Sequence, residues 1–259
     1  MQIAFYAASA LIDGRDQVFA PDMTPTIQLA NNLSVAVTAL IAVLVTARVA
    51  KVPWRALLSH PRAFDVRRLW VYGGLSVCLV GAGALATALL APETTGWVGF
   101  GLSPTTWALL AVSVLTTPLQ SAGEELIFRS AMMPAIASWV RSVRPAIALG
   151  MLVSSILFAV IHVPGDPWLF AHLTTVGLAT AAMAVISRGI EAPIAFHVAN
   201  NLVTSILNTT LAAGEAPVFE RSAGAAGPSY LILMAVNVAV VGVVWWRERS
   251  RRCWAGVRP

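Results

Sequence analysis

Seven long apolar segments constrain the fold of this chain more than any other feature of its sequence. Each is close to the roughly 20 residues that a helix needs to cross a hydrocarbon core. The runs are continuously apolar and do not alternate with polar residues, so they predict helices and not barrel strands. We expect an all-α, polytopic integral membrane bundle of about seven transmembrane helices. The segments are Ile27–Val45, Trp70–Ala91, Thr105–Gly123, Pro145–Val163, Trp168–Ile186, Ala192–Ala213 and Tyr230–Trp246.

The composition agrees with a membrane protein. Hydrophobic residues make up 58% of the chain and charged residues 11%, whereas soluble domains are about 45–50% apolar and about 25% charged. A soluble globular domain is therefore excluded. The run Ile3–Ile12 is too short to span and lacks a preceding basic region, so we interpret it as an interfacial segment and not a signal peptide.

The basic residues predict an orientation. Of the 17 Lys and Arg residues, all but Arg15 and Arg221 fall in alternate connections between the segments. The positive-inside rule then places the N-terminus outside and the C-terminus in the cytoplasm. The net charge of +5 follows from these loops, which favour contact with lipid headgroups and require no nucleic-acid partner. The chain has far more arginine than lysine, which is typical of proteins from GC-rich bacterial genomes. We therefore expect a protein of a bacterial plasma membrane.

Two adjacent carboxylates and an arginine lie beside apolar sequence in the stretch Gly123–Arg129. Ionisable groups at membrane depth are unfavourable by a few kcal/mol each, so they mark a functional site or a paired structural lock. Glu125 and Arg129 are i,i+4 neighbours and can pair on one helix face. Glu124 lies about 100° around the helix and needs a partner elsewhere. The alternative is an interfacial helix start with acids near its positive end.

Three further polar residues lie within apolar sequence. His162 ends the fourth segment, and His197 and Asn201 are i,i+4 neighbours in the sixth. A carboxylate, two imidazoles and a carboxamide are together what hydrolysis of an amide by water requires. The sequence marks no serine or cysteine as a nucleophile in the same way. Direct attack by water is therefore favoured over a covalent route.

These residues form three ordered motifs that resemble a known family. Glu-Glu-x-x-x-Arg, Phe-x-x-x-His and His-x-x-x-Asn match Glu124–Arg129, Phe158–His162 and His197–Asn201. The chain resembles the CPBP (CAAX protease and bacteriocin-processing, or Abi) family of intramembrane proteases, which are similar to type II CAAX prenyl endopeptidases. The resemblance covers roughly residues 105–212. It implies a membrane-associated protein or peptide substrate, lipidated or not.

The resemblance also implies roles for individual residues. Glu124 and His162 would activate the water, and His197 and Asn201 would form the oxyanion site. The supporting residues would be Glu125, Arg129 and Phe158. The need for a metal stays open, because Glu124, His162 and His197 could bind one divalent ion such as zinc, while the same pattern also suits a metal-free glutamate mechanism.

The sequence therefore predicts an intramembrane endopeptidase in three parts. Residues 1–104 would supply N-terminal membrane helices of unassigned role, residues 105–212 the catalytic core, and residues 213–259 the last transmembrane helix and a basic cytoplasmic tail. One alternative is a non-catalytic scaffold or bacteriocin-immunity protein that keeps the fold. A small-solute transporter is another alternative, but it would be expected to show inverted repeats, which we do not find.

One geometric conflict remains in this scheme. A straight helix from Pro145 to His162 rises about 25 Å, at about 1.5 Å per residue, which would separate His162 from Glu124. We therefore expect the helix that carries Glu124 to continue to about Val140, and the turn Pro164–Pro167 to be sunk into the protein. The polar cavity is expected to open to the cytoplasmic side.

Overall fold

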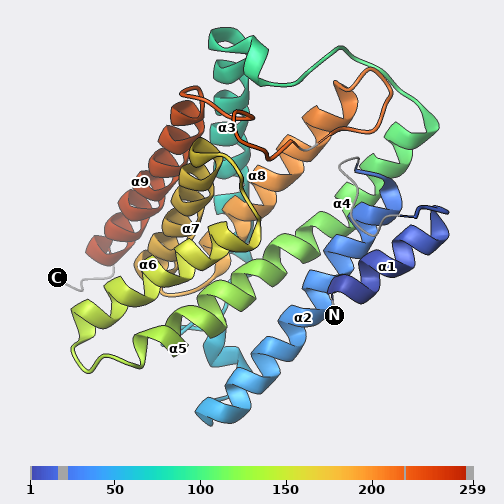
Figure 1. Cartoon of the computed structure of the whole chain (residues 1–259). Coiled ribbons are helices and arrows are strands. Elements are labelled where there is room, and N and C mark those ends of the chain that lie inside the picture. Colours follow the sequence, from blue (N-terminus) through green and yellow to red (C-terminus); the bar gives the residue numbers. More distant parts are fainter. Residues whose placement is uncertain (1, 17–22, 219, 255–259) are drawn as a thin grey trace.

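The computed structural model describes residues 2–16, 23–218 and 220–254, and within these its regular secondary structure is helical apart from two isolated β-bridges. The predicted all-α bundle is confirmed (Figure 1). The α-helices are α1 (Gln2–Ile12), α2 (Pro25–Ala50), α3 (Val66–Leu90), α4 (Pro104–Glu125), α5 (Met133–Ala137), α6 (Val143–Ile161), α7 (Pro167–Ser187), α8 (Glu191–Thr210) and α9 (Tyr230–Trp254).

Among the described residues, five helices are long and apolar enough to cross a membrane: α2, α3, α6, α7 and α9. The other two predicted spans are also helices, α4 and α8, and both carry several buried polar residues. Helix α4 packs between α2 and α8, and α8 also packs against α3 and α7. The polar faces of α4 and α8 therefore turn toward neighbouring helices, while α4 exposes apolar side chains such as Leu115 on its other side. This arrangement keeps the polar side chains away from lipid.

The helix that carries Glu124 continues without a break well past this residue. Helix α4 passes directly into a π-helical stretch, η3 (Leu126–Met132), and then into α5, with helical backbone angles at both junctions. The wide π turn ends just before Pro134, which has no N–H to donate to the preceding turn. The predicted extension to about Val140 is therefore close to the observed end at Ala137. Isolated π turns within α-helices are frequent at functional sites.

The turn at residues 164–167 is not sunk into the protein, so that expectation is wrong. Gly165 and Pro167 are exposed, and only Asp166 is buried. The geometric conflict is resolved instead by inclination, because α6 and the rod from α4 to α5 run obliquely relative to α7 and α9 (Figure 1). An inclined helix rises less than 1.5 Å per residue along the bundle axis. The end of α6 therefore lies at the same cavity as Glu124.

Close backbone contacts fix this oblique arrangement. A Cβ atom added at Gly150 of α6 would lie 2.7 Å from the carbonyl oxygen of Met133. A Cβ atom added at Gly177 of α7 would lie 2.9 Å from the Cα atom of Ser155. Glycine lets helices approach closely in membrane bundles. Helix α6 is thereby held tightly between α5 and α7.

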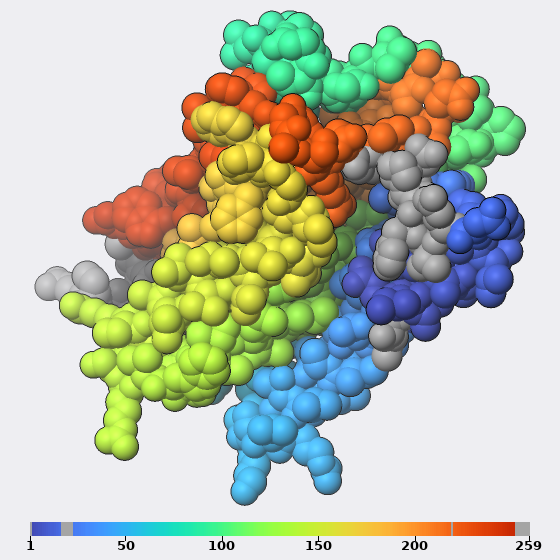
Figure 2. Space-filling view, viewed as in Figure 1, coloured from blue at the N-terminus to red at the C-terminus, as the bar shows by residue number. Residues whose placement is uncertain are grey.

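The connections gather at two opposite ends of the bundle. At one end, Ile190 N–H donates to the Leu58 carbonyl oxygen, which joins the basic 51–65 connection to the start of α8. At the other end, Gly165 N–H donates to the Arg221 carbonyl oxygen. Figure 2 shows the 211–229 connection lying against the α6–α7 turn on this face. The short helix α1 packs on α2 and does not itself have the length to span.

Candidate active site

The Glu125–Arg129 pair lies at the centre of the bundle and is fully buried. The Nε atom of Arg129 lies 3.2 Å from Glu125 Oε2, so the predicted i,i+4 pairing is confirmed. The guanidinium also donates to Thr180 Oγ1 of α7, at 2.9 Å from Nε and 2.6 Å from Nη2. It stacks over the ring of Phe158, 5.6 Å from the ring centroid. Glu125 is therefore a carboxylate held in place by a fixed cation.

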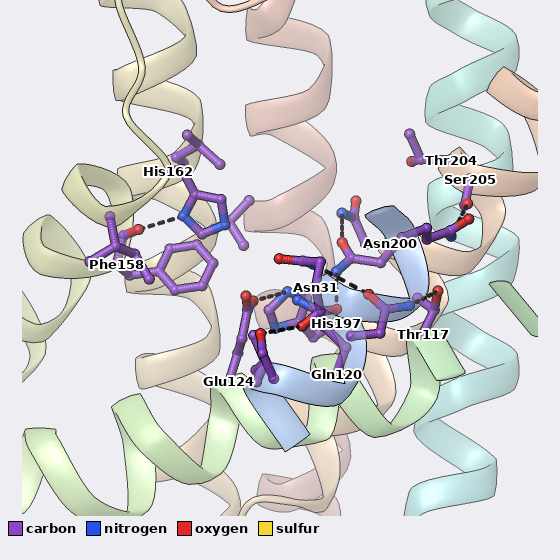
Figure 3. Close-up of a pocket in the computed structure, with 18 of the residues that line it drawn as sticks. Asn31, Thr117, Gln120, Glu124, Phe158, His162, His197, Asn200, Thr204 and Ser205 are labelled. Atoms are coloured by element: carbon purple, nitrogen blue, oxygen red, sulfur yellow. Dashed lines mark hydrogen bonds and ion pairs between the residues drawn. The ribbon is translucent and has the colours of Figure 1, made fainter. Parts of the chain in front are cut away.

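His197 of α8 lies between the two adjacent carboxylates. Its Nδ1 atom is 2.7 Å from Glu125 Oε1, and its Nε2 atom is 3.2 Å from Glu124 Oε2 (Figure 3). Glu124 thus finds its partner on another helix, as its position relative to Arg129 predicts. Two carboxylates and one guanidinium leave one net negative charge in a buried place, which is unfavourable unless it is compensated. A protonated His197, placed between the two carboxylates, supplies the compensating charge.

Phe158 separates the two histidines and positions the second one. Its ring centroid lies 5.7 Å from that of His197 and 4.7 Å from that of His162. His162 Nδ1 lies 2.6 Å from the carbonyl oxygen of Phe158. Because a carbonyl oxygen only accepts hydrogen bonds, Nδ1 carries a proton, and in the neutral ring Nε2 is then an acceptor. The ring of His162 faces the cavity from the side opposite Glu124 (Figure 3).

A single cavity of about 580 Å³ brings the predicted catalytic residues together. Glu124, His162, His197 and Asn201 all line it. The amide nitrogen of Asn201 donates to Ser121 Oγ at 3.1 Å and more weakly to Gln120 Oε1 at 3.4 Å. The four residues come from α4, the end of α6, and α8. The fold therefore places residues far apart in the sequence around one space.

Helix α2 contributes polar residues to this cavity that the sequence analysis missed. Gln28, Asn31 and Asn32 all line it, as does Gln120 of α4. A signal was present in the sequence, because Gln28 is three and four residues before the two asparagines, and this spacing places them on one face of an otherwise apolar helix. The N-terminal helices therefore form part of the site and are not only a scaffold beside it.

The cavity extends toward the end of the bundle that carries few basic residues. Met23, Pro217 and Arg221 line it there, and they lie opposite the 51–65 connection that holds most of the loop arginines. The sequence predicts that this basic end is cytoplasmic and that the cavity opens to the cytoplasm. This part of the lining does not support a cytoplasmic opening, and the orientation of the chain remains a prediction.

The 220–224 segment holds the turn that carries His162. Arg221 Nη1 donates to the His162 carbonyl oxygen at 2.6 Å, and Gly165 N–H donates to the Arg221 carbonyl oxygen at 2.7 Å. Asp166 caps α7 and accepts from Gly224 N–H at 2.9 Å. Burial raises the pKa of Asp166, but the backbone N–H groups of Leu169, Gly224 and Trp168 outweigh it and hold the pKa below its ordinary value. We call these contacts the clasp.

The predicted metal ligands do not form a metal site in this arrangement. His197 Nδ1 is hydrogen-bonded to Glu125 Oε1, and its Nε2 atom lies 3.2 Å from Glu124 Oε2. Within residues 2–16, 23–218 and 220–254, no three His, Cys, Asp or Glu side chains are grouped closely enough to hold an ion. The residues as arranged do not fit a two-histidine, one-glutamate ion. The chemistry below is therefore derived from the side chains alone.

Comparison with known proteins agrees with the motif resemblance. Residues 103–203 match the family model described as type II CAAX prenyl endopeptidase Rce1-like. The chain is also 24% identical over 214 residues to the uncharacterized protein YyaK of Bacillus subtilis (strain 168), which covers 78% of this chain and 70% of that protein. No solved structure matches significantly. The resemblance inferred from the three motifs is thereby confirmed.

Proposed function

We propose, from the membership of residues 103–203 in the Rce1-like family of type II CAAX prenyl endopeptidases, that this integral membrane protein hydrolyses a peptide bond with water activated by Glu124. The observation that carries the proposal is the single cavity lined by Glu124, His162 and His197. A carboxylate that faces a cavity has the properties of a general base. A carboxylate enclosed by cations would not have them.

The first step is attack by water on the substrate carbonyl carbon. The water lies between Glu124 and the acceptor nitrogen Nε2 of His162, and each accepts one of its hydrogen atoms in a hydrogen bond. Glu124 removes one proton as the new C–O bond forms, and the carbonyl π electrons move to oxygen and give a tetrahedral oxyanion. Glu124 then delivers that proton to the peptide nitrogen as the C–N bond breaks. The oxyanion re-forms the C=O bond as the C–N bond breaks, which gives a carboxylic acid and an amine. The acid then gives its proton to the amine, so the products leave as a carboxylate and an ammonium group.

His197 and Asn201 are proposed to stabilise the oxyanion. Both donors have protein partners in the present arrangement, namely Glu124 for His197 and Ser121 and Gln120 for Asn201. The substrate carbonyl oxygen would take the place of these partners when it binds. The proton released from water would leave Glu124 neutral, which weakens its hold on His197 at the moment the oxyanion forms. Donors directed at the developing charge are among the largest contributions to such catalysis.

The remaining predictions about the setting belong to the same proposal. The substrate is a membrane-associated protein or peptide, and the protein lies in a bacterial plasma membrane with its N-terminus outside and its C-terminus in the cytoplasm. The division into residues 1–104, 105–212 and 213–259 remains a prediction, and residues 255–259 of the tail lie outside the described residues.

The proposal is tested by cleavage of defined peptides in proteoliposomes. The probes are a library of internally quenched, N-acylated decapeptides of uncharged residues, with each cleaved bond located by mass spectrometry. We expect wild-type protein to cleave members of the library and Glu124→Gln to be slower by at least about 10³-fold, because it lacks the base. Glu215→Gln removes an exposed carboxylate outside the cavity and should retain the wild-type rate. Equal rates for the two variants would remove Glu124 from the mechanism.

A further inference from the structure

The cavity has two chemically different walls that meet at Glu124 and His197 (Figure 3). One wall is apolar and is formed by η3, α6 and α7. Its residues include Ile127, Phe128, Phe158, Ile161, Leu173 and Val176. The other wall is formed by α2, α4 and α8 and is rich in neutral carboxamides. Its residues include Gln28, Asn31, Asn32, Gln120, Asn200 and Asn201.

A wall of carboxamides is suited to bind a peptide backbone. Each carboxamide both donates and accepts hydrogen bonds, as a peptide group does. An extended peptide at membrane depth must find partners for its N–H and C=O groups, because lipid offers none. The edge of a β-strand could supply hydrogen bonds to such a peptide, but the described residues contain no strand beyond two isolated bridges. The carboxamides can take over this task.

Some of these carboxamides hold the bundle together, and others do not. Gln28 Nε2 donates to Ser113 Oγ of α4 at 2.7 Å, and Asn32 Nδ2 donates to Thr116 Oγ1 at 2.8 Å. Such bonds stabilise helix packing in membranes. The hydrogen bonds of Asn31 run instead to α1 and to its neighbour Asn32.

Asn200 likewise does not join separate helices. Its amide nitrogen donates to Asn201 Oδ1 at 3.1 Å on the same helix. Asn31 comes from α2 and Asn200 from α8, and both line the cavity (Figure 3). These two residues are therefore the carboxamides whose hydrogen bonds a ligand can replace without separating α2, α4 and α8.

We infer that Asn31 and Asn200 bind the backbone of an extended, uncharged peptide whose apolar side chain packs on the Phe158 wall. This inference rests on the proposed function, because it takes the ligand to be the peptide substrate. It names the substrate as a segment without charged side chains in the cavity, since Glu124 and Arg221 are the only Asp, Glu, Lys or Arg residues in its described lining. A charged side chain held between the two walls would lie unpaired at membrane depth.

The test is a double-mutant cycle between side chain and backbone. The probe is an N-palmitoylated, dansyl-labelled octapeptide of Ala, Leu and Ser, together with versions in which each backbone nitrogen is methylated in turn. Binding is measured by fluorescence anisotropy on liposomes that contain the Glu124→Gln protein, so that no cleavage interferes. We expect methylation at one or two positions to weaken binding about fivefold, the effect of one hydrogen bond.

The same loss is expected when Asn31→Leu or Asn200→Leu is added to Glu124→Gln. Methylation at the matching position should then weaken binding no further, because the bond is already absent. Asn208→Leu is the matched control. Asn208 lies on α8, as Asn200 does, but its carboxamide accepts from Trp97 Nε1 at 2.9 Å outside the cavity. In the Asn208→Leu protein, methylation of the peptide should therefore keep its full effect on binding. Asn31→Gln, which retains the amide, provides a second variant should Asn31→Leu not fold.

The outcomes separate this inference from the proposed function. Additive losses at every position, or no saturable binding of the octapeptide, would overturn the inference even if wild-type protein cleaves its peptides. Non-additive losses with no cleavage by wild-type protein would keep the binding site and remove the proposed hydrolysis.

Discussion

Two buried clusters of charge lie near the N-terminal half of α8, and they differ in what surrounds them. The site cluster consists of Glu124, Glu125, Arg129 and His197. The end cluster consists of Arg62, Arg68, Tyr72, Glu191 and Glu248. In the end cluster, Glu191 accepts from both Nη atoms of Arg62 and from Asp65 N–H, and Glu248 accepts from Arg68 and Tyr72.

The difference lies in the cavity. None of the end-cluster residues lines it, whereas Glu124 and His197 of the site cluster do. A buried charge that is paired on all sides holds elements together, and removing one partner leaves the other uncompensated. A buried charge that faces a cavity can act on a ligand there. Burial and charge alone therefore do not identify a catalytic carboxylate, and the space beside it does.

The largest loss of stability is expected from Glu125→Gln. This change leaves Arg129 buried without its counterion, which destabilises by about 3–5 kcal/mol. The free energy of unfolding is measured by denaturant titration in detergent micelles. Glu124→Gln is the matched control, and it should stay within about 1 kcal/mol of wild type because its carboxylate faces the cavity. Equal destabilisation by both changes would mean that the two carboxylates play the same structural part.

Glu191→Gln tests the end cluster and should have a smaller effect. The side chain of Arg62 is 26% exposed, so water can solvate it in part when its partner is lost. We expect a loss of about 1–3 kcal/mol, below that of a fully enclosed pair. The cleavage rate per folded molecule should match wild type. A drop in that rate beyond the fraction unfolded would show that the end cluster acts on the site.

The third test concerns the clasp, and its expected effect is smaller than that of either charge cluster. Arg221→Gln removes the bond to the His162 carbonyl oxygen, which should loosen the turn that positions His162. We expect kcat to fall about threefold to tenfold with KM changed less, because the missing contact positions a water-binding residue. Arg188→Gln, an exposed arginine at the opposite end of the bundle, should leave both constants unchanged. A change in KM alone would indicate that Arg221 contacts substrate instead.

The smallest expected effect is a pH dependence of the clasp. The pKa of Asp166 lies below its ordinary value in the folded protein, so its stabilising contribution is present above the unfolded pKa of about 3.9 and is lost as pH falls toward the lower folded value. Exchange of the Gly224 amide, corrected for the intrinsic rate, should accelerate below about pH 4. In Asp166→Asn, which has no charge to titrate, the corrected rate should not change with pH. A pH-independent wild-type rate would contradict this account.

Much of the fold was predictable because membrane helices carry a strong local signal. Each predicted span from Ile27 to Trp246 overlaps a helix of the structure, and the Glu125–Arg129 pair follows from i,i+4 spacing. The inclination of α6 was not predictable, because it depends on contacts at Gly150 and Gly177 with residues distant in sequence.

The rest of the site required the tertiary structure for a similar reason. His197 lies between Glu124 and Glu125 only because α4 and α8 pack together, and no spacing within either segment encodes that contact. Asn31 of α2 lines the cavity, but the family motifs begin only at Glu124 and so give no indication of its role. Arg62 counted in the sequence only as one of the loop arginines that predict orientation, and only the fold reveals that it pairs with Glu191.

The most direct test of the account compares Glu124→Gln and Glu191→Gln in the same proteoliposomes, with cleavage and unfolding measured on each. The account predicts that Glu124→Gln loses cleavage by at least about 10³-fold and unfolds at the wild-type midpoint. It predicts that Glu191→Gln cleaves at the wild-type rate per folded molecule and unfolds at a lower midpoint. Cleavage by Glu124→Gln at the rate of Glu215→Gln would contradict the central claim that the cavity-facing carboxylate carries the chemistry.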